Sequence, residues 1–87
     1  MDSIARRVAL RHSFRYEPKE TKEHKIERVM KAIREATGLS KGLSTDIADA
    51  YVRGREVERL ALQKGWPIDR GLVTGPAGSL ELASLPL

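Results

Sequence analysis

Cysteine is absent from this chain of 87 residues, and the absence excludes several classes of small protein. Without thiols the chain has neither a disulfide framework nor a thiolate metal site. Long apolar runs are also missing: none is long enough to span a bilayer, and residues 1–11 lack the continuous apolar core of a signal peptide. The composition therefore predicts a cytoplasmic protein with no membrane partner.

The short chain and the small number of aromatic residues limit the core that the protein can build. The length allows one small domain, residues 1–87, and such a domain buries only about 60 to 65% of its unfolded surface. A domain of this size is marginally stable alone. We therefore expect it to form a homodimer or to dock on a larger partner.

Residues 8–16 show the clearest pattern in the sequence. One set of alternating positions is mostly apolar: Val8, Leu10, His12, Phe14 and Tyr16. The intervening set is Ala9, Arg11, Ser13 and Arg15. Side chains leave a strand on alternate faces, so the pattern predicts a strand with one apolar face and one face that carries arginines. Guanidinium groups can fork onto phosphate or a guanine edge, so this face indicates a nucleic-acid partner, DNA or RNA.

The positive charge is concentrated in the same region. The chain has a net charge of +4, and residues 1–16 carry +3 of it, since four arginines (Arg6, Arg7, Arg11 and Arg15) face only Asp2. Such a distribution is typical of the electrostatic footprint of a nucleic-acid-binding protein.

The remaining pattern predicts two helices and a hairpin. Pro18 ends the strand, and apolar spacing predicts helices over 20–37 and 45–64, the first stopped by Gly38 and the second capped by Ser44 or Thr45. Turn residues predict a hairpin over 71–83 with Val73 opposite Leu80. The predicted class is α+β: an N-terminal strand, two antiparallel helices and a C-terminal β-hairpin.

Gly54 and Trp66 have specific expected roles in the predicted fold. Gly54 lies within the second predicted helix, and we expect it to allow close approach of another backbone rather than to mark a kink, because the apolar spacing continues through it. Trp66 follows Gly65, and we expect it to fill the junction between that helix and the hairpin.

The order of strand, helix, glycine-containing turn and helix carries a resemblance to a known family. The residues from Phe14 to Pro18, from Ile26 to Ala36 and from Thr37 to Ser40 resemble the ribbon-helix-helix family of bacterial and phage DNA-binding proteins. The resemblance implies that the strands pair across a homodimer and that Arg11, Ser13 and Arg15 enter the major groove. It also implies that the turn from Gly38 to Ser40 holds a phosphate.

The predicted function is that of a small basic DNA-binding regulator of transcription. Arg6 and Arg7 would grip the nucleic-acid backbone, and Ser40 and Lys41 would hold a flanking phosphate. One alternative is a winged helix-turn-helix with its turn at Gly54 and a wing over 73–80, although its first helix would have to come from residues 1–12.

A second alternative is a phage or mobile-element interaction module that docks on a larger protein or nucleoprotein assembly. In that interpretation the exposed strand adds to a partner's sheet edge, with Tyr16 and Trp66 as anchors.

Catalytic and metal-binding patterns are weak. His24 lies one turn from Glu20 and Glu27, a spacing that can hold a metal, but such residues in a charge-rich helix usually form a solvated face. No spacing connects serine, histidine and aspartate as a triad, and no glycine-rich phosphate loop follows a strand. We therefore expect neither an enzyme nor a cofactor or resident metal.

Overall fold

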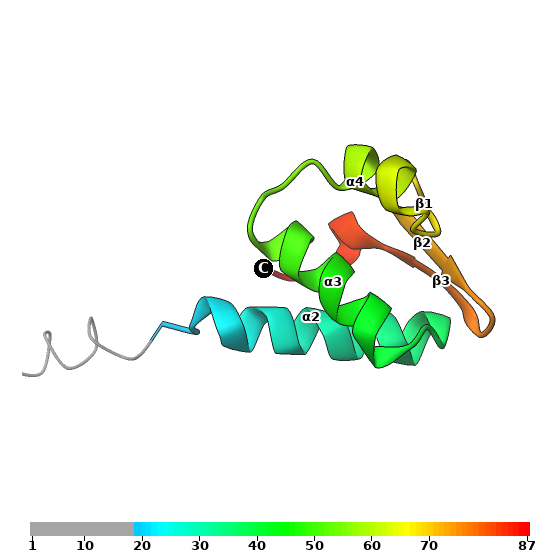
Figure 1. The fold of residues 1–87 in the computed structure, drawn as a ribbon. Coiled ribbons are helices and arrows are strands. Elements are labelled where there is room, and N and C mark those ends of the chain that lie inside the picture. The colour runs from blue at the N-terminus through cyan, green and yellow to red at the C-terminus, as the bar shows by residue number, and fades with distance from the viewer. Residues whose placement is uncertain (1–18) are drawn as a thin grey trace, which may run out of the picture.

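The computed structural model describes residues 19–87, which form three helices and a small sheet (Figure 1). The helices are α2 (Lys22–Thr37), α3 (Lys41–Val52) and α4 (Val57–Lys64). The strands are β1 (Ile68–Asp69), β2 (Leu72–Gly75) and β3 (Gly78–Glu81), followed by the 3-10 turn Leu82–Ser84. The mixed helix and sheet class is confirmed, whereas the predicted strand over 8–16 lies outside the described residues.

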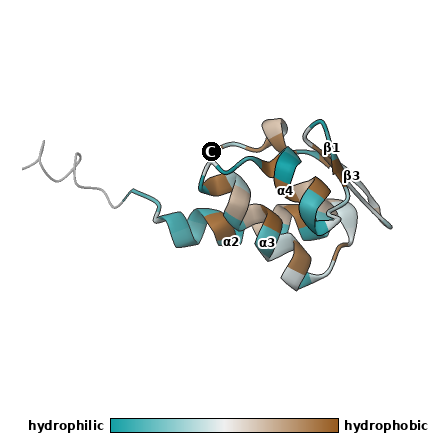
Figure 2. Cartoon of the chain, turned by 45° about the horizontal axis from the view of Figure 1, so that its top comes forward, coloured by the Kyte–Doolittle hydropathy of each residue, from teal (hydrophilic) through white to brown (hydrophobic). Residues whose placement is uncertain are grey.

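Helix α2 forms where the sequence predicts it. The hydroxyl of Thr21 accepts a hydrogen bond from the His24 N–H at 3.1 Å, so the helix begins at Lys22, two residues later than expected. Gly38 ends it in the left-handed region with φ +73°. The buried residues recur at helical spacing: Val29, Met30, Ile33 and Thr37. The first turns are mainly hydrophilic (Figure 2).

The prediction of one helix over 45–64 is wrong, because two helices occupy this region. Helix α3 starts four residues earlier, since Ser40, rather than Ser44 or Thr45, accepts the capping hydrogen bond from the Leu43 N–H at 3.2 Å. Ser44 is instead fully buried, and its hydroxyl has no hydrogen-bond partner among the described residues.

Helix α3 ends in a Schellman motif at Gly54, which separates it from α4. The Gly54 N–H donates to the Tyr51 carbonyl at 3.1 Å, and the Arg55 N–H donates to the Ala50 carbonyl at 2.9 Å. This motif needs a left-handed residue, which Gly54 supplies with φ +71°. The expected close approach at Gly54 is therefore wrong: a Cβ there would meet nothing within 4 Å.

The sheet is antiparallel with strand order β1-β2-β3. Within the predicted hairpin, Val73 pairs with Leu80 as expected, and Gly75 pairs with Gly78 across the turn. Strand β1, which the sequence pattern did not predict, pairs Ile68 with Val73. Val73 is fully buried, while Leu72 and Thr74 on either side of it are exposed, so one face of the sheet covers the core.

The core lies between α2, α3 and the inner face of the sheet. Its fully or almost fully buried apolar residues are Val29, Met30, Ile33, Ile47, Ala48, Val73 and Leu82. Trp66 is half-buried and packs against this cluster just after α4, which agrees with its expected place at the junction. Tyr51 connects α3 to the 3-10 turn through a 3.0 Å hydrogen bond from its hydroxyl to the Leu82 carbonyl.

The tip of the hairpin closes the end of α2. The Ala77 N–H donates to the Thr37 carbonyl at 2.9 Å, which satisfies one of the carbonyls that a helix C-terminus leaves without an intrahelical partner. The approach is close enough to require glycine at position 75, since a Cβ there would lie 2.9 Å from the Thr37 carbonyl carbon. The α2–α3 turn is thereby fixed against the sheet.

Candidate nucleic-acid interface

The structure describes only two of the predicted site residues: Ser40, which ends the turn between α2 and α3, and Lys41, the first residue of α3. Only Gly38, Leu39 and Ser40 connect the two helices. The Gly38 N–H donates to the Arg34 carbonyl at 2.8 Å, so the chain leaves α2 through a tight cap and enters α3 immediately. Ser40 and Lys41 are both exposed, and the Ser40 hydroxyl is engaged as the cap of α3.

The start of α3 presents an uncompensated positive end. The N–H groups of Lys41 and Gly42 have no acceptor within residues 19–87, as expected for the first residues of a helix. The first turn of α3 contains no acidic residue, whereas α2 and α4 have Glu23 and Glu58 at the same place. No side chain covers Gly42 within 4 Å of where its Cβ would be. This end of α3 therefore attracts anions without competition from an acid in its own first turn.

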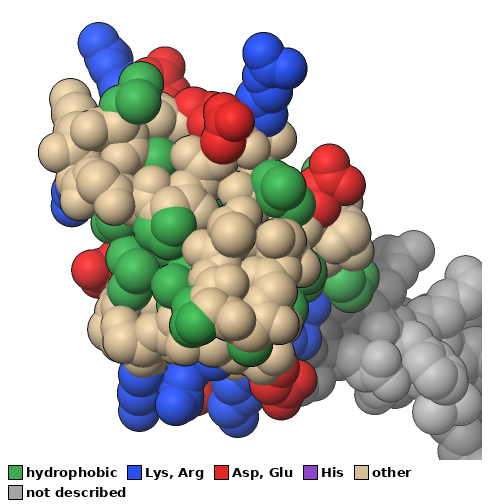
Figure 3. Space-filling view, turned by 90° about the vertical axis from the view of Figure 1, so that its right-hand side faces the viewer, with side chains coloured by type: hydrophobic (Ala, Val, Ile, Leu, Met, Phe, Trp, Pro, Cys, Tyr) green, Lys and Arg blue, Asp and Glu red, His purple; other side chains and the backbone are tan. Residues whose placement is uncertain are grey.

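A shallow depression of about 310 Å³ adjoins this helix start. It is lined by Lys31, Arg34, Glu35, Gly38 and Leu39. Lysine and arginine side chains gather along the lower edge of Figure 3, at the level where α2 lies in Figure 1. The depression thus places two α2 cations next to the turn that precedes Ser40.

Few acids oppose the cations at this turn. Within residues 19–87, neither Arg34 nor Lys41 forms an ion pair, and Lys31 lies 3.9 Å from Glu27, at the limit of one. Glu35 adds one negative charge to the depression. Lys31 and Arg34 were not predicted as site residues, because they lie on a helix face of mixed charge. Because residues three apart are neighbours on a helix surface, the spacing of Lys31 and Arg34 just before Gly38 could have indicated two adjacent cations near the turn.

The other predicted site residues lie outside the described part of the chain. These are Arg6, Arg7, Arg11, Ser13 and Arg15, and the same holds for the strand that was expected to carry the last three. Trp66, the anchor expected for an interaction module, is half-buried, and the Lys64 ammonium lies 5.6 Å from the centre of its ring.

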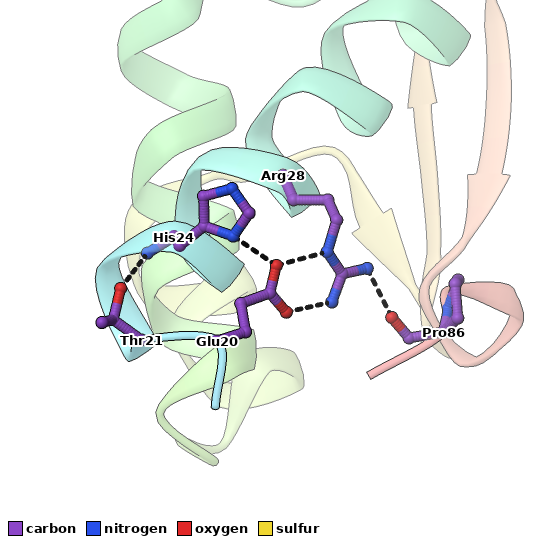
Figure 4. Close-up of polar contacts among 5 residues, drawn as sticks. All are labelled: Glu20, Thr21, His24, Arg28 and Pro86. Atoms are coloured by element: carbon purple, nitrogen blue, oxygen red, sulfur yellow. Dashed lines mark hydrogen bonds and ion pairs between the residues drawn. The ribbon is translucent and has the colours of Figure 1, made fainter. Parts of the chain in front are cut away.

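Two of the three residues considered for a metal site, Glu20 and His24, instead form a cluster with Arg28 and, through it, Pro86. We call these four residues the Glu20 clamp (Figure 4). The third, Glu27, lies 3.9 Å from Lys31. Arg28 donates to both carboxylate oxygens of Glu20 at 2.8 and 3.0 Å, and His24 Nδ1 lies 2.5 Å from Oε2. The remaining Arg28 nitrogen donates to the Pro86 carbonyl at 2.6 Å. The clamp therefore ties the start of α2 to the C-terminal residues.

Hydrogen bonding from Arg28, aided by His24, lowers the pKa of Glu20 to about 2, against a smaller opposing effect of partial burial. Among residues 19–87 no group of three histidine, aspartate or glutamate side chains is arranged to hold a metal ion. The Glu20 clamp is therefore an ion pair between Glu20 and Arg28 that connects two parts of the fold.

No protein-family model, curated protein or solved structure matches the chain. None of the helices in residues 19–87 is long and apolar enough to cross a membrane.

Proposed function

We propose that the protein binds nucleic acid through phosphate contacts and acts as a small DNA-binding regulator. The observation that carries the proposal is the turn between α2 and α3 with the start of α3. The first two N–H groups of α3, those of Lys41 and Gly42, have no acceptor within residues 19–87, and Arg34 lines the depression beside Gly38 and Leu39. Neither Arg34 nor Lys41 forms an ion pair within residues 19–87. Backbone donors, a positive helix end and long cationic side chains together suit a phosphate group.

The charge of the rest of the chain supports the same proposal. Residues 1–18 contain four arginines against Asp2 and Glu17, and residues 19–87 contain twelve basic residues against ten acidic ones. Half of the net charge of +4 thus lies in each part. Phosphate contacts of this kind fix position and provide affinity without reading sequence.

A salt titration against a random DNA duplex tests the proposal. The logarithm of affinity should fall linearly with the logarithm of salt concentration, with a slope of about −0.9 for each phosphate contact. The double variant Arg34→Ala, Lys41→Ala should flatten that slope by up to about 1.8, because two contacts are lost. Both side chains are exposed and form no ion pair within residues 19–87, so thermal melting should stay unchanged.

The matched control removes the same charge from the other end of α2. In Lys22→Ala, Lys25→Ala the two lost cations lie in the first turn of a 16-residue helix, roughly 20 to 24 Å from Gly38. The slope should change less in this control than in the Arg34 and Lys41 double variant. Equal slopes in the two double variants would remove the α2–α3 turn from the interface, and salt-independent affinity of the unaltered protein would reject phosphate binding altogether.

A further inference from the structure

Thr37 is a buried polar residue at the end of α2, and it connects that helix to the turn before α3. Its side chain is fully buried, although threonine is a poor helix former. The hydroxyl donates to the Ile33 carbonyl at 2.6 Å, inside α2, and accepts from the Leu39 N–H at 3.3 Å, inside the turn. Because both bonds satisfy buried or half-buried polar groups, they hold Leu39 in a defined place relative to the last turn of α2.

The backbone of Thr37 is held by the tip of the β2–β3 hairpin, which lies beside the end of α2 in Figure 1. The Thr37 carbonyl accepts a hydrogen bond from the Ala77 N–H at 2.9 Å. A Cβ at Gly38 would lie 3.1 Å from the Ala77 Cβ, and a Cβ at Gly78 would lie 2.9 Å from the Ala36 carbonyl oxygen. The hairpin tip is therefore in close contact with the last residues of α2 and with its cap.

These contacts determine where α3 begins. Only Leu39 and Ser40 lie between Gly38 and the first residue of α3, Lys41. Leu39 is half-buried and packs against the core, so the chain enters α3 along a path with contacts on both sides. An anion site made of backbone N–H groups, such as those of Lys41 and Gly42, needs those groups in a fixed geometry. The contacts of Thr37 provide that geometry without using any charge.

We infer that Thr37 is a positioning residue for phosphate binding at the α2–α3 turn and that it acts together with the hairpin tip, residues 75–78, an inference that rests on the proposed function. Thr37 and the tip hold the turn in the arrangement in which the first N–H groups of α3 can bind phosphate together with Arg34 and Lys41. Coupling between two sites is reciprocal, so phosphate bound at the turn favours the hairpin tip in its docked position.

Thr37→Val in the full chain tests the inference, because it keeps the shape of the side chain and removes the acceptor of the Leu39 N–H. The net charge does not change. The salt slope on random duplex DNA should nevertheless flatten towards that of Arg34→Ala, Lys41→Ala. The affinity at a fixed salt concentration should fall by about 5-fold or more, the lower end of the range usual for coupled sites. A loss of folding stability alone would leave the slope of the folded protein unchanged.

Two further variants separate the hydroxyl of Thr37 from its packing. Thr37→Ser keeps the hydroxyl and loses a buried methyl group, so it should melt at a lower temperature and retain the unaltered salt slope. In the Arg34→Ala, Lys41→Ala background, Thr37→Val should flatten the slope little further, because the phosphate contacts that it positions are already lost. A full additional effect in that background would overturn the inference, since Thr37 would then act elsewhere.

Tyr51→Phe is the matched control, because it also removes one hydroxyl that donates to a backbone carbonyl, that of Leu82 at 3.0 Å. Tyr51 lies in the last turn of α3, about 15 Å along the helix from Lys41. The control should lower the melting temperature and leave the salt slope and the affinity unchanged. A flattened slope in Tyr51→Phe would show that the slope follows stability, and it would overturn the inference.

Amide hydrogen exchange of the unaltered full chain tests the reciprocal effect without any variant. Random duplex DNA should slow exchange of the Ala77 and Leu39 N–H groups by a larger factor than that of the Leu82 N–H. The Leu82 N–H donates to the Gly71 carbonyl at 2.9 Å, at the end of the hairpin away from its tip. Stabilisation of the whole domain by a ligand would slow the three by the same factor.

The possible failures of this inference differ from failure of the proposed function. If Thr37→Val melts at a lower temperature but keeps the salt slope and affinity of the unaltered protein, Thr37 is structural only and the inference is overturned, while phosphate binding still stands. Equal slowing at Ala77 and Leu82 overturns it as well, even if Thr37→Val does not fold. If the Arg34→Ala, Lys41→Ala variant keeps the unaltered slope, the turn is not the phosphate site and both proposals fall.

Discussion

At the scale of single residues, glycine has two opposite roles in this chain. At Gly75 the absence of a side chain allows the hairpin to lie against the Thr37 carbonyl. At Gly42, in the first turn of α3, no neighbour lies within 4 Å of where a Cβ would be. The same substitution should therefore have opposite effects on stability at the two positions.

We expect Gly75→Ala to lower the free energy of unfolding by about 1 to 3 kcal/mol, because the new methyl group would overlap backbone that cannot move independently. Gly42→Ala should raise it by about 0.4 to 1 kcal/mol, because alanine restricts the unfolded chain and fits the helix. Urea titration of the two variants measures both changes. A neutral Gly75→Ala would show that the hairpin tip does not pack on α2 as described.

At the scale of elements, local signals predicted α2 and the hairpin well. The apolar spacing and Gly38 predicted the body and the end of α2, and the glycines around Pro76 predicted the hairpin turn, whereas the cap at Thr21 was not predicted. These elements are encoded by caps and turns close in sequence, which pattern reasoning detects.

The second helix was predicted wrongly because two local signals conflict. Apolar residues continue at helical spacing from Tyr51 to Val57, which predicts an uninterrupted helix. Gly54 nevertheless ends α3 in a Schellman motif, and no other residue near it indicates that end. The cap of α3 was missed for a related reason, since Ser40, Ser44 and Thr45 all have capping side chains. Burial of Ser44 decides between them, and burial is a tertiary property.

The candidate site was predicted only in part. The turn at Gly38 marked Ser40 and Lys41, but the contribution of Arg34 depends on which charges of α2 lack a partner after folding. A sequence of alternating lysines and glutamates does not specify that outcome.

The Glu20 clamp links two elements and makes their association dependent on pH. The folded-state pKa of Glu20 is lowered from 4.5 to about 2, so its ionised form stabilises the fold above pH 4.5 and this contribution disappears as the pH falls from 4.5 towards 2. Glu20→Gln should therefore melt at a lower temperature than the unaltered protein at pH 6, and the difference should vanish near pH 2.

Glu23→Gln is the control for the clamp, since it removes one carboxylate from the first turn of α2 without a bond to Arg28. Melting curves by circular dichroism at pH 6, 4 and 2 give the comparison. A melting difference between Glu20→Gln and the unaltered protein that is the same at all three pH values would mean that the ion pair with Arg28 is not what Glu20 contributes.

At the scale of the whole molecule, the described core and the excess positive charge are distributed differently along the chain. The described core is assembled from α2, α3, the sheet and the 3-10 turn, all within residues 19–87. Half of the excess positive charge lies in residues 1–18. The homodimer expected from the length of the chain stays a prediction, and sedimentation of the full chain measures it. The residues of the described core and the four arginines of residues 1–18 are thus separate in sequence, so their effects on folding and on binding can be tested separately.

The variant that replaces Arg6, Arg7, Arg11 and Arg15 by glutamine tests this separation, because it reduces the net charge from +4 to zero. Its melting temperature should equal that of the unaltered protein. Its salt slope on random duplex DNA should flatten by about 0.9 for each arginine that contacts a phosphate, up to about 3.6, twice the limit for Arg34 and Lys41 together. If the two sets contact the same duplex independently, their slope changes add when the variants are combined. An unchanged slope in the fourfold variant would confine phosphate binding to the folded part of the chain, and a lowered melting temperature would show that these arginines belong to the fold.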